Sequence, residues 1–102
     1  MLTKEIIKQK LYNKKEHIES LRVATLGLFG SYLRNTQHSE SDIDFLVSFQ
    51  NNRETFENFM GLCDFLEQLF EGNKVDVVSV NGLSKYIGPK ILKEVDYVEI
   101  TA

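Results

Sequence analysis

The sequence has little of what a secreted or membrane protein would need. It contains one cysteine, one proline and no tryptophan among 102 residues. The single cysteine, Cys63, cannot form a disulfide within the chain, which is typical of proteins in a reducing compartment. No apolar run approaches the roughly 18 residues that span a bilayer, and the charged start of the chain does not have the pattern of a secretory signal. We therefore expect a cytoplasmic protein with no membrane association, in which Cys63 is a buried core thiol.

A strong positive charge is also missing. The net charge is −3 at pH 7 and the isoelectric point is near 5.3. The attraction to phosphates that dominates nucleic-acid affinity is therefore weak overall, and we expect no stand-alone nucleic-acid binding. Half of the twelve basic residues nevertheless lie within the first 22 positions. Either a solvated helix face or a patch for an acidic partner would explain this cluster.

The spacing of apolar residues predicts helices and strands that alternate along one domain, residues 1–102. No repeat, linker or low-complexity stretch divides the chain. We expect helices at 3–20, 51–71 and 89–94, a turn or short helix at 31–41, one helical turn at 83–87, and strands at 23–29, 42–49, 74–80 and 95–100. This order predicts an α/β (α+β) fold in which helices flank a small mixed sheet.

The long central helix has sequence signals at both of its expected ends. Asn51 is followed three residues later by Glu54, a spacing that can cap a helix, and Gly72 suits the C-terminal end. The aromatic and aliphatic stripe between these ends indicates core packing and not a ligand site.

Three aspartates lie in otherwise apolar strands. Asp42 and Asp44 flank Ile43, so they point to the same face with their backbones about 7 Å apart. Asp76 interrupts a run of valines, where an unpaired buried carboxylate would be costly. If the two strands are neighbours, repulsion raises the pKa values of these carboxylates unless a cation neutralises them, and an all-oxygen site suits Mg²⁺. Each aspartate taken alone is more simply a strand cap or a surface residue.

The first strand runs directly into Gly30 and Ser31. Glycine lets the backbone approach a phosphate closely, and a serine at the start of a helical turn offers a hydroxyl and amides to an anion. The same pair also occurs in ordinary turns. Arg34, on the same side of the turn, is either a charged fork for a triphosphate or a solvated surface arginine. His17 and His38 have no neighbours at ligand spacing, so we expect both to be exposed.

Taken together, GSYLRNTQHSESDID resembles the signature of the DNA polymerase beta-type nucleotidyltransferase superfamily, with Gly-Ser separated from Asp-x-Asp by ten residues. The closing segment PKILKEVDYVEI resembles the minimal nucleotidyltransferase, or MNT, branch. The resemblance implies that Gly30 and Ser31 hold nucleotide phosphates and that Asp42 and Asp44 bind two Mg²⁺ ions. It also implies that Asp76 completes the catalytic metal site and helps to deprotonate the attacking hydroxyl.

Minimal members of this family resemble antitoxins whose partner is an all-helical HEPN-type RNase toxin. The resemblance implies a transferase that moves a nucleoside monophosphate, with ATP as the expected donor, onto a hydroxyl such as a tyrosine of that partner. Two alternatives are a non-catalytic antitoxin that masks its partner by contact and a transferase that acts on a small molecule. Three crowded acids favour catalysis, and the short chain argues against the small-molecule acceptor. The identity of the NTP, the acceptor and any self-association stay open.

Overall fold

A computed structural model describes residues 2–100, in which four strands form one sheet in the order β3-β2-β1-β4. The strands are β1 (Val23–Phe29), β2 (Ile43–Phe49), β3 (Val75–Ser79) and β4 (Asp96–Val98). Strand β1 pairs antiparallel with both β2 and β4, whereas β2 and β3 run parallel. The expectation of a small mixed sheet in an α/β fold is confirmed.

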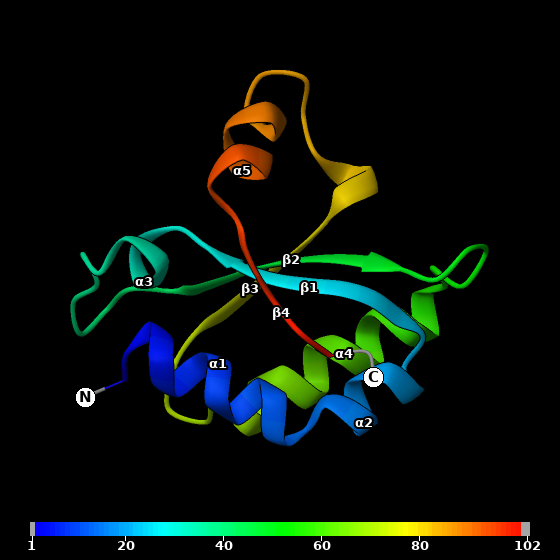
Figure 1. Cartoon of the computed structure of the whole chain (residues 1–102), viewed down its shortest axis with the longest axis horizontal. Coiled ribbons are helices and arrows are strands. Elements are labelled where there is room, and N and C mark those ends of the chain that lie inside the picture. Colours follow the sequence, from blue (N-terminus) through cyan, green and yellow to red (C-terminus); the bar gives the residue numbers. More distant parts are fainter. Residues whose placement is uncertain (1, 101–102) are drawn as a thin grey trace.

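The helices are distributed unequally over the two faces of the sheet (Figure 1). On one side lie α1 (Lys4–Asn13), α2 (Lys15–Ser20) and α4 (Phe56–Leu69). The short α3 (Ser31–Arg34) follows β1, and the 3-10 helix η1 (Val80–Gly82) and α5 (Gly88–Glu94) lie on the opposite side. No helix within residues 2–100 is long and apolar enough to cross a lipid bilayer.

The core fills the space between the sheet and the three helices α1, α2 and α4. Its side chains alternate along the strands, because every second residue of a strand faces the same side. The fully buried members from the helices and from β1 and β2 are Ile7, Leu11, Ile18, Val23, Leu26, Leu28, Ile43, Phe45, Val47, Leu62 and Leu66. Each contributes roughly 1.5–3 kcal/mol relative to an exposed side chain, so this face supplies most of the stability of the fold.

The first helix is interrupted where the sequence predicts continuity. Lys14 leaves the helical conformation, with φ −114° and ψ 19°, and separates α1 from α2. Leu11 and Ile18, on either side of the break, are both fully buried. The break therefore keeps apolar side chains of both segments in the core.

The predicted cap of the central helix is wrong. Helix α4 begins at Phe56, and the Thr55 hydroxyl accepts the hydrogen bond of the Asn58 N–H at 3.1 Å. Glu54 instead accepts hydrogen bonds from Ser79 and Asn81, at the far end of β3. A tertiary contact thus competes with the local capping pattern.

One smaller expectation needs correction, and another is confirmed. Cys63 in α4 is only partly buried, and burial, together with the nearby acids Glu67 and Asp64, raises the pKa of its thiol. The expected helical turn at 83–87 is confirmed: the Gly88 N–H donates to the Ser84 carbonyl at 2.9 Å, a hydrogen bond of helical spacing, and α5 then begins at Gly88.

Candidate active site

The candidate site forms where β1 ends and β2 begins. The two strands are antiparallel, so Phe29 at the end of β1 lies opposite Asp44 near the start of β2. Gly30 and Ser31 follow immediately, and α3 then leads back towards β2. The Gly-Ser turn and the aspartate strand are therefore the two sides of one antiparallel pair.

Position 30 requires a glycine because of its backbone conformation and because of its contact with Asp44. Its dihedrals, φ 77° and ψ −154°, fall in a region that is essentially restricted to glycine. A Cβ at this position would overlap the Asp44 carboxylate at Oδ2. The absence of a side chain thus allows the turn to lie directly against Asp44.

Two of the three predicted aspartates face each other across the parallel pair of strands. Asp44 of β2 and Asp76 of β3 are register partners, so their side chains leave the sheet on the same face. Asp42 comes one residue before β2, and its Oδ2 lies 4.0 Å from the Nζ of Lys74. Asp76 is exposed, contrary to the expectation that it is buried among valines, because β3 is an edge strand and α5 does not cover it.

Negative charge accumulates at Asp44. Burial, then the charges of Asp76 and Asp42, raises its pKa from 3.8 to about 6, while Arg34 opposes the rise. Like charges disfavour the ionised form, and a bound cation would relieve this repulsion. The carboxylate oxygens fit a hard divalent cation. Within residues 2–100, however, no three acidic, histidine or cysteine side chains are already gathered as a metal site.

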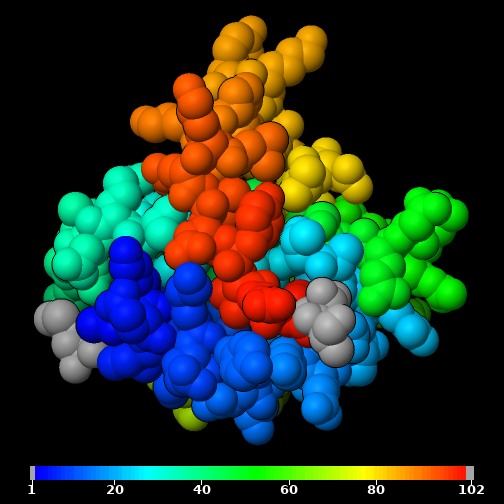
Figure 2. All heavy atoms as spheres, in the orientation of Figure 1, coloured from blue at the N-terminus to red at the C-terminus, as the bar shows by residue number. Residues whose placement is uncertain are grey.

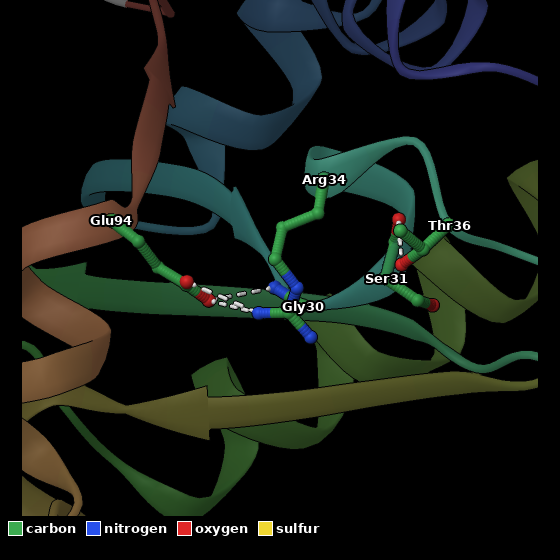
Figure 3. Close-up of polar contacts among 5 residues, drawn as sticks. All are labelled: Gly30, Ser31, Arg34, Thr36 and Glu94. Atoms are coloured by element: carbon green, nitrogen blue, oxygen red, sulfur yellow. Dashed lines mark hydrogen bonds and ion pairs between the residues drawn. The ribbon is translucent and has the colours of Figure 1, made fainter.

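Arg34 and Gly30 share one partner, Glu94 at the end of α5 (Figure 3). The Nη1 of Arg34 lies 2.9 Å and 3.1 Å from the two carboxylate oxygens of Glu94, and the Gly30 N–H donates to Oε1 at 3.2 Å. The Ser31 carbonyl accepts from the N–H and the hydroxyl of Thr36, which closes the α3 turn. The structure thus places Arg34 beside the Gly-Ser turn, which is one of the two alternatives that the sequence left open, and pairs it with Glu94.

Sequence reasoning missed Glu94. Its pairing with Arg34 spans 60 positions, and the Lys90–Glu94 spacing by itself indicates an ordinary solvated helix pair. The two histidines are exposed as predicted, and His17 packs against Phe65 with ring centroids 4.5 Å apart.

The residues predicted for the site do not line the hollow at the opposite end of β2. A hollow of about 490 Å³ lies at the other end of β2 from the aspartates, lined by Phe49, Gln50, Asn51, Asn52, Glu54 and Asn81. Charge and backbone geometry, not the size of a cavity, distinguish the region around Asp44.

Comparison with known proteins agrees with this geometry. Residues 4–98 match the family model "Polymerase beta, Nucleotidyltransferase". The chain therefore belongs to the polymerase beta nucleotidyltransferase family and has its fold.

Individual relatives indicate which kind of nucleotidyltransferase this chain is. The protein adenylyltransferase MntA of Thermococcus cleftensis is 39% identical over 99 residues, which cover 96% of this chain and 98% of that protein. A solved structure described as a "putative minimal nucleotidyltransferase" matches with 30% identity and a TM-score of 0.69, over 87% of this chain and 93% of that one. A structure of a toxin-antitoxin with AMP-PNP matches with 25% identity and a TM-score of 0.54, over 82% and 71%. The protein is a nucleotidyltransferase of the protein adenylyltransferase type, similar to MntA.

Proposed function

We propose that this protein is an antitoxin that transfers AMP from ATP, with Mg²⁺ as cofactor, to a tyrosine hydroxyl of a HEPN-type RNase toxin in the cytoplasm. The observation that carries the proposal is the pairing of Asp44 with Asp76 beside the Gly30 turn, in a member of a nucleotidyltransferase family. The names of its relatives support it, since one is an adenylyltransferase and another is a toxin-antitoxin that contains AMP-PNP. We assign all of residues 1–102 to this single domain.

The site residues divide into two groups. Asp42, Asp44 and Asp76 would hold two Mg²⁺ ions. The raised pKa of Asp44 supports this assignment, because it reflects burial and the nearby charges of Asp76 and Asp42, which Arg34 offsets only in part. Divalent cations, when bound, supply positive charge beside the triphosphate and the leaving group. The backbone at Gly30, the Ser31 hydroxyl and Arg34 bind the phosphates.

The reaction is a substitution at the α-phosphorus of ATP. The acceptor oxygen forms a bond to the α-phosphorus while the bond from that phosphorus to the oxygen bridging the α- and β-phosphates breaks, and pyrophosphate leaves. The hydroxyl proton passes to the carboxylate of Asp76. Its exposure suits this role, because a group on another protein can approach it directly.

A protein acceptor agrees with the shape of the open side of the sheet. Helix α5 and the segment before it stand out on that side (Figure 1). They also expose large apolar side chains. Tyr86 is 92%, Ile87 59% and Leu92 47% exposed. Clustered exposed apolar side chains indicate a contact surface for another protein.

The test is transfer onto the co-purified toxin partner, followed by intact-mass spectrometry, with ATP, GTP, CTP or UTP and with Mg²⁺ or EDTA. We expect the partner to gain the mass of one AMP only with ATP and Mg²⁺, and Asp42→Asn to abolish the gain. The exposed Asp64→Asn is the matched control and should transfer normally. Protection from the toxin without any mass change would instead establish an antitoxin that acts by contact alone.

Thermal melting provides an independent measurement of the nucleotide site. A ligand at 100 times its dissociation constant stabilises the native state by about 2.7 kcal/mol. We expect Mg²⁺ and ATP together to raise the melting temperature of the wild type but not of Asp42→Asn. An equal rise in both proteins would place the nucleotide elsewhere.

A further inference from the structure

The last residue of α5 places a carboxylate where the proposed function places a phosphate. Glu94 accepts hydrogen bonds from the Gly30 N–H and from the guanidinium of Arg34. Both donors lie far from Glu94 in the sequence; Gly30 and Glu94 are more than 60 positions apart. The contact is therefore a tertiary one that only the folded chain creates.

The two hydrogen-bond donors that hold Glu94 can also bind other anions that have several oxygen atoms. A guanidinium and a backbone N–H that converge on one group bind carboxylates and phosphates alike, as charge-assisted hydrogen bonds. The pair is also partly open, with side-chain exposures of 52% for Arg34 and 27% for Glu94. A phosphate from solution can therefore reach the donors without unfolding of the core.

Glu94 lies close to another carboxylate. The Gly30 N–H donates to Glu94, and Gly30 itself lies against the Asp44 carboxylate, so the two acids flank one residue. Their like charges repel each other, which weakens the hold of the two donors on Glu94; a phosphate that binds together with a divalent cation does not meet this repulsion.

The support behind Glu94 also permits displacement. Figure 2 shows α5 and the segment before it standing out from the rest of the molecule. The helix is short, from Gly88 to Glu94, and most of its outer side chains are exposed. The Glu94 side chain can therefore turn away from its donors without moving the core residues between the sheet and α1, α2 and α4.

We propose that Glu94 is an internal competitor of the nucleotide phosphates, occupying the Gly30–Arg34 donor pair until ATP displaces it. This inference rests on the proposed function, because it names the residue that limits nucleotide affinity at the same site. Glu94 then sets the ATP concentration at which the enzyme begins to act. The opposite interpretation makes Glu94 a positioning residue that holds Arg34 ready for phosphate.

Isothermal titration with MgATP separates these interpretations by the direction of the effect. Glu94→Gln keeps the size of the side chain and removes its charge, so we expect MgATP to bind about fivefold more tightly. Glu94→Asp keeps the charge but shortens the reach, and should give a smaller gain. The control Glu99→Gln removes one exposed negative charge just beyond β4, away from the Gly30 turn, and should leave affinity unchanged.

A second measurement tests the donor pair itself. In an Arg34→Ala background, the gain from Glu94→Gln should shrink, because one of the two shared donors is gone; this is a double-mutant cycle. Pyrophosphate as the ligand should show the same order of affinities as ATP, since it contains the phosphates without the nucleoside.

Either of two results would overturn the proposal. Weaker binding by Glu94→Gln would identify Glu94 as a positioning residue, and equal gains from Glu94→Gln and Glu99→Gln would reduce the effect to general charge. These results are distinguishable from failure of the proposed function, because transfer of AMP to the partner is measured separately. Affinity that rises in Glu94→Gln without any transfer would support the competitor while refuting the enzymatic role.

Discussion

The two faces of the sheet differ more sharply than any two segments of the chain. On one face the helices α1, α2 and α4 bury aliphatic and aromatic side chains, among them Ile43, Phe45 and Val47 of β2. On the other face the intervening residue Asp44 stands opposite Asp76, next to Gly30. Adjacent residues of β2 thus face the core and the proposed site in turn, because a strand alternates its side chains.

The open face also destabilises the fold in the absence of ligand. Asp44 has a pKa raised to about 6, first by burial and then by the charges of Asp76 and Asp42, so its ionisation costs more free energy in the folded chain than in the unfolded chain. The buried face has to offset this penalty. Substitutions on the two faces should therefore separate activity from stability.

The largest expected effect is the loss of transfer in Asp76→Asn. If Asp76 holds cations beside the triphosphate as we propose, removing its carboxylate should raise the barrier by several kcal/mol, or about 1000-fold in rate. The free energy of unfolding should stay the same or rise, since one repulsive charge is lost. Single-turnover kinetics and urea denaturation measure the two quantities, and a variant that loses both would show Asp76 to be structural.

Phe45→Ala should give the opposite result. Phe45 is fully buried and packs on Phe70, with ring centroids 5.7 Å apart. Truncation of a buried phenylalanine costs about 3–5 kcal/mol, so we expect a much lower melting temperature. Activity per folded molecule should survive at low temperature, and calorimetry with transfer assays below the transition checks this. Loss of activity in the folded fraction would mean that the faces are coupled.

The next effect is smaller: the free energy of unfolding of the metal-free protein should depend on pH through Asp44. Because the pKa of Asp44 rises from 3.8 to about 6 on folding, the folded state binds the proton more tightly. The resulting stability is present below about pH 4 and is lost as the pH rises through about 6. For this partly exposed group we expect a loss of about 1–2 kcal/mol.

Denaturation in EDTA at several pH values, with Asp44→Asn as the reference, measures this contribution. The difference between the two proteins removes the effects of the other carboxylates. A difference that does not change between pH 4 and pH 7 would contradict the shift. Addition of Mg²⁺ at pH 7 should restore stability to the wild type alone.

The smallest expected effect concerns the ion pair between α1 and β4. Lys8 Nζ lies 2.9 Å from Asp96 Oδ2, with side-chain exposures of 37% and 40%. Exposed pairs of this kind contribute at most about 1 kcal/mol and weaken with salt. Lys8→Met should thus lower the free energy of unfolding slightly in low salt and hardly at all in 1 M NaCl. An effect as large as that of Phe45→Ala would disprove the dominance of the apolar core.

Local patterns in the sequence predict local structure well here. The apolar block Val23–Phe29, followed by Gly30, is the strand that the structure contains, and the Asp-x-Asp motif lies where β2 begins. The Asn51–Glu54 cap was wrong because Glu54 bonds to distant residues instead. Capping preferences describe only neighbouring residues, so a tertiary partner can override them.

Features of the site that depend on distant contacts were beyond the sequence. The exposure of Asp76 follows from the edge position of β3, which no pattern within the valine run reveals. Glu94 reaches Gly30 and Arg34 only because β4 pairs with β1 and brings the end of α5 over the turn. Strand order, and not composition, decides both.

The parallel pairing of β2 with β3 also bears on how the chain folds. The antiparallel strands β1 and β2 are joined by the connection that contains the short α3, so they can pair early. The parallel strand β3 can pair with β2 only after the longer crossover through α4. Long-range closures are slow, and this one brings Asp44 and Asp76 together with like charges. Refolding should therefore accelerate when divalent cations are present from the start. The carboxylates that we assign to catalysis would then also set the pace of the last step of assembly.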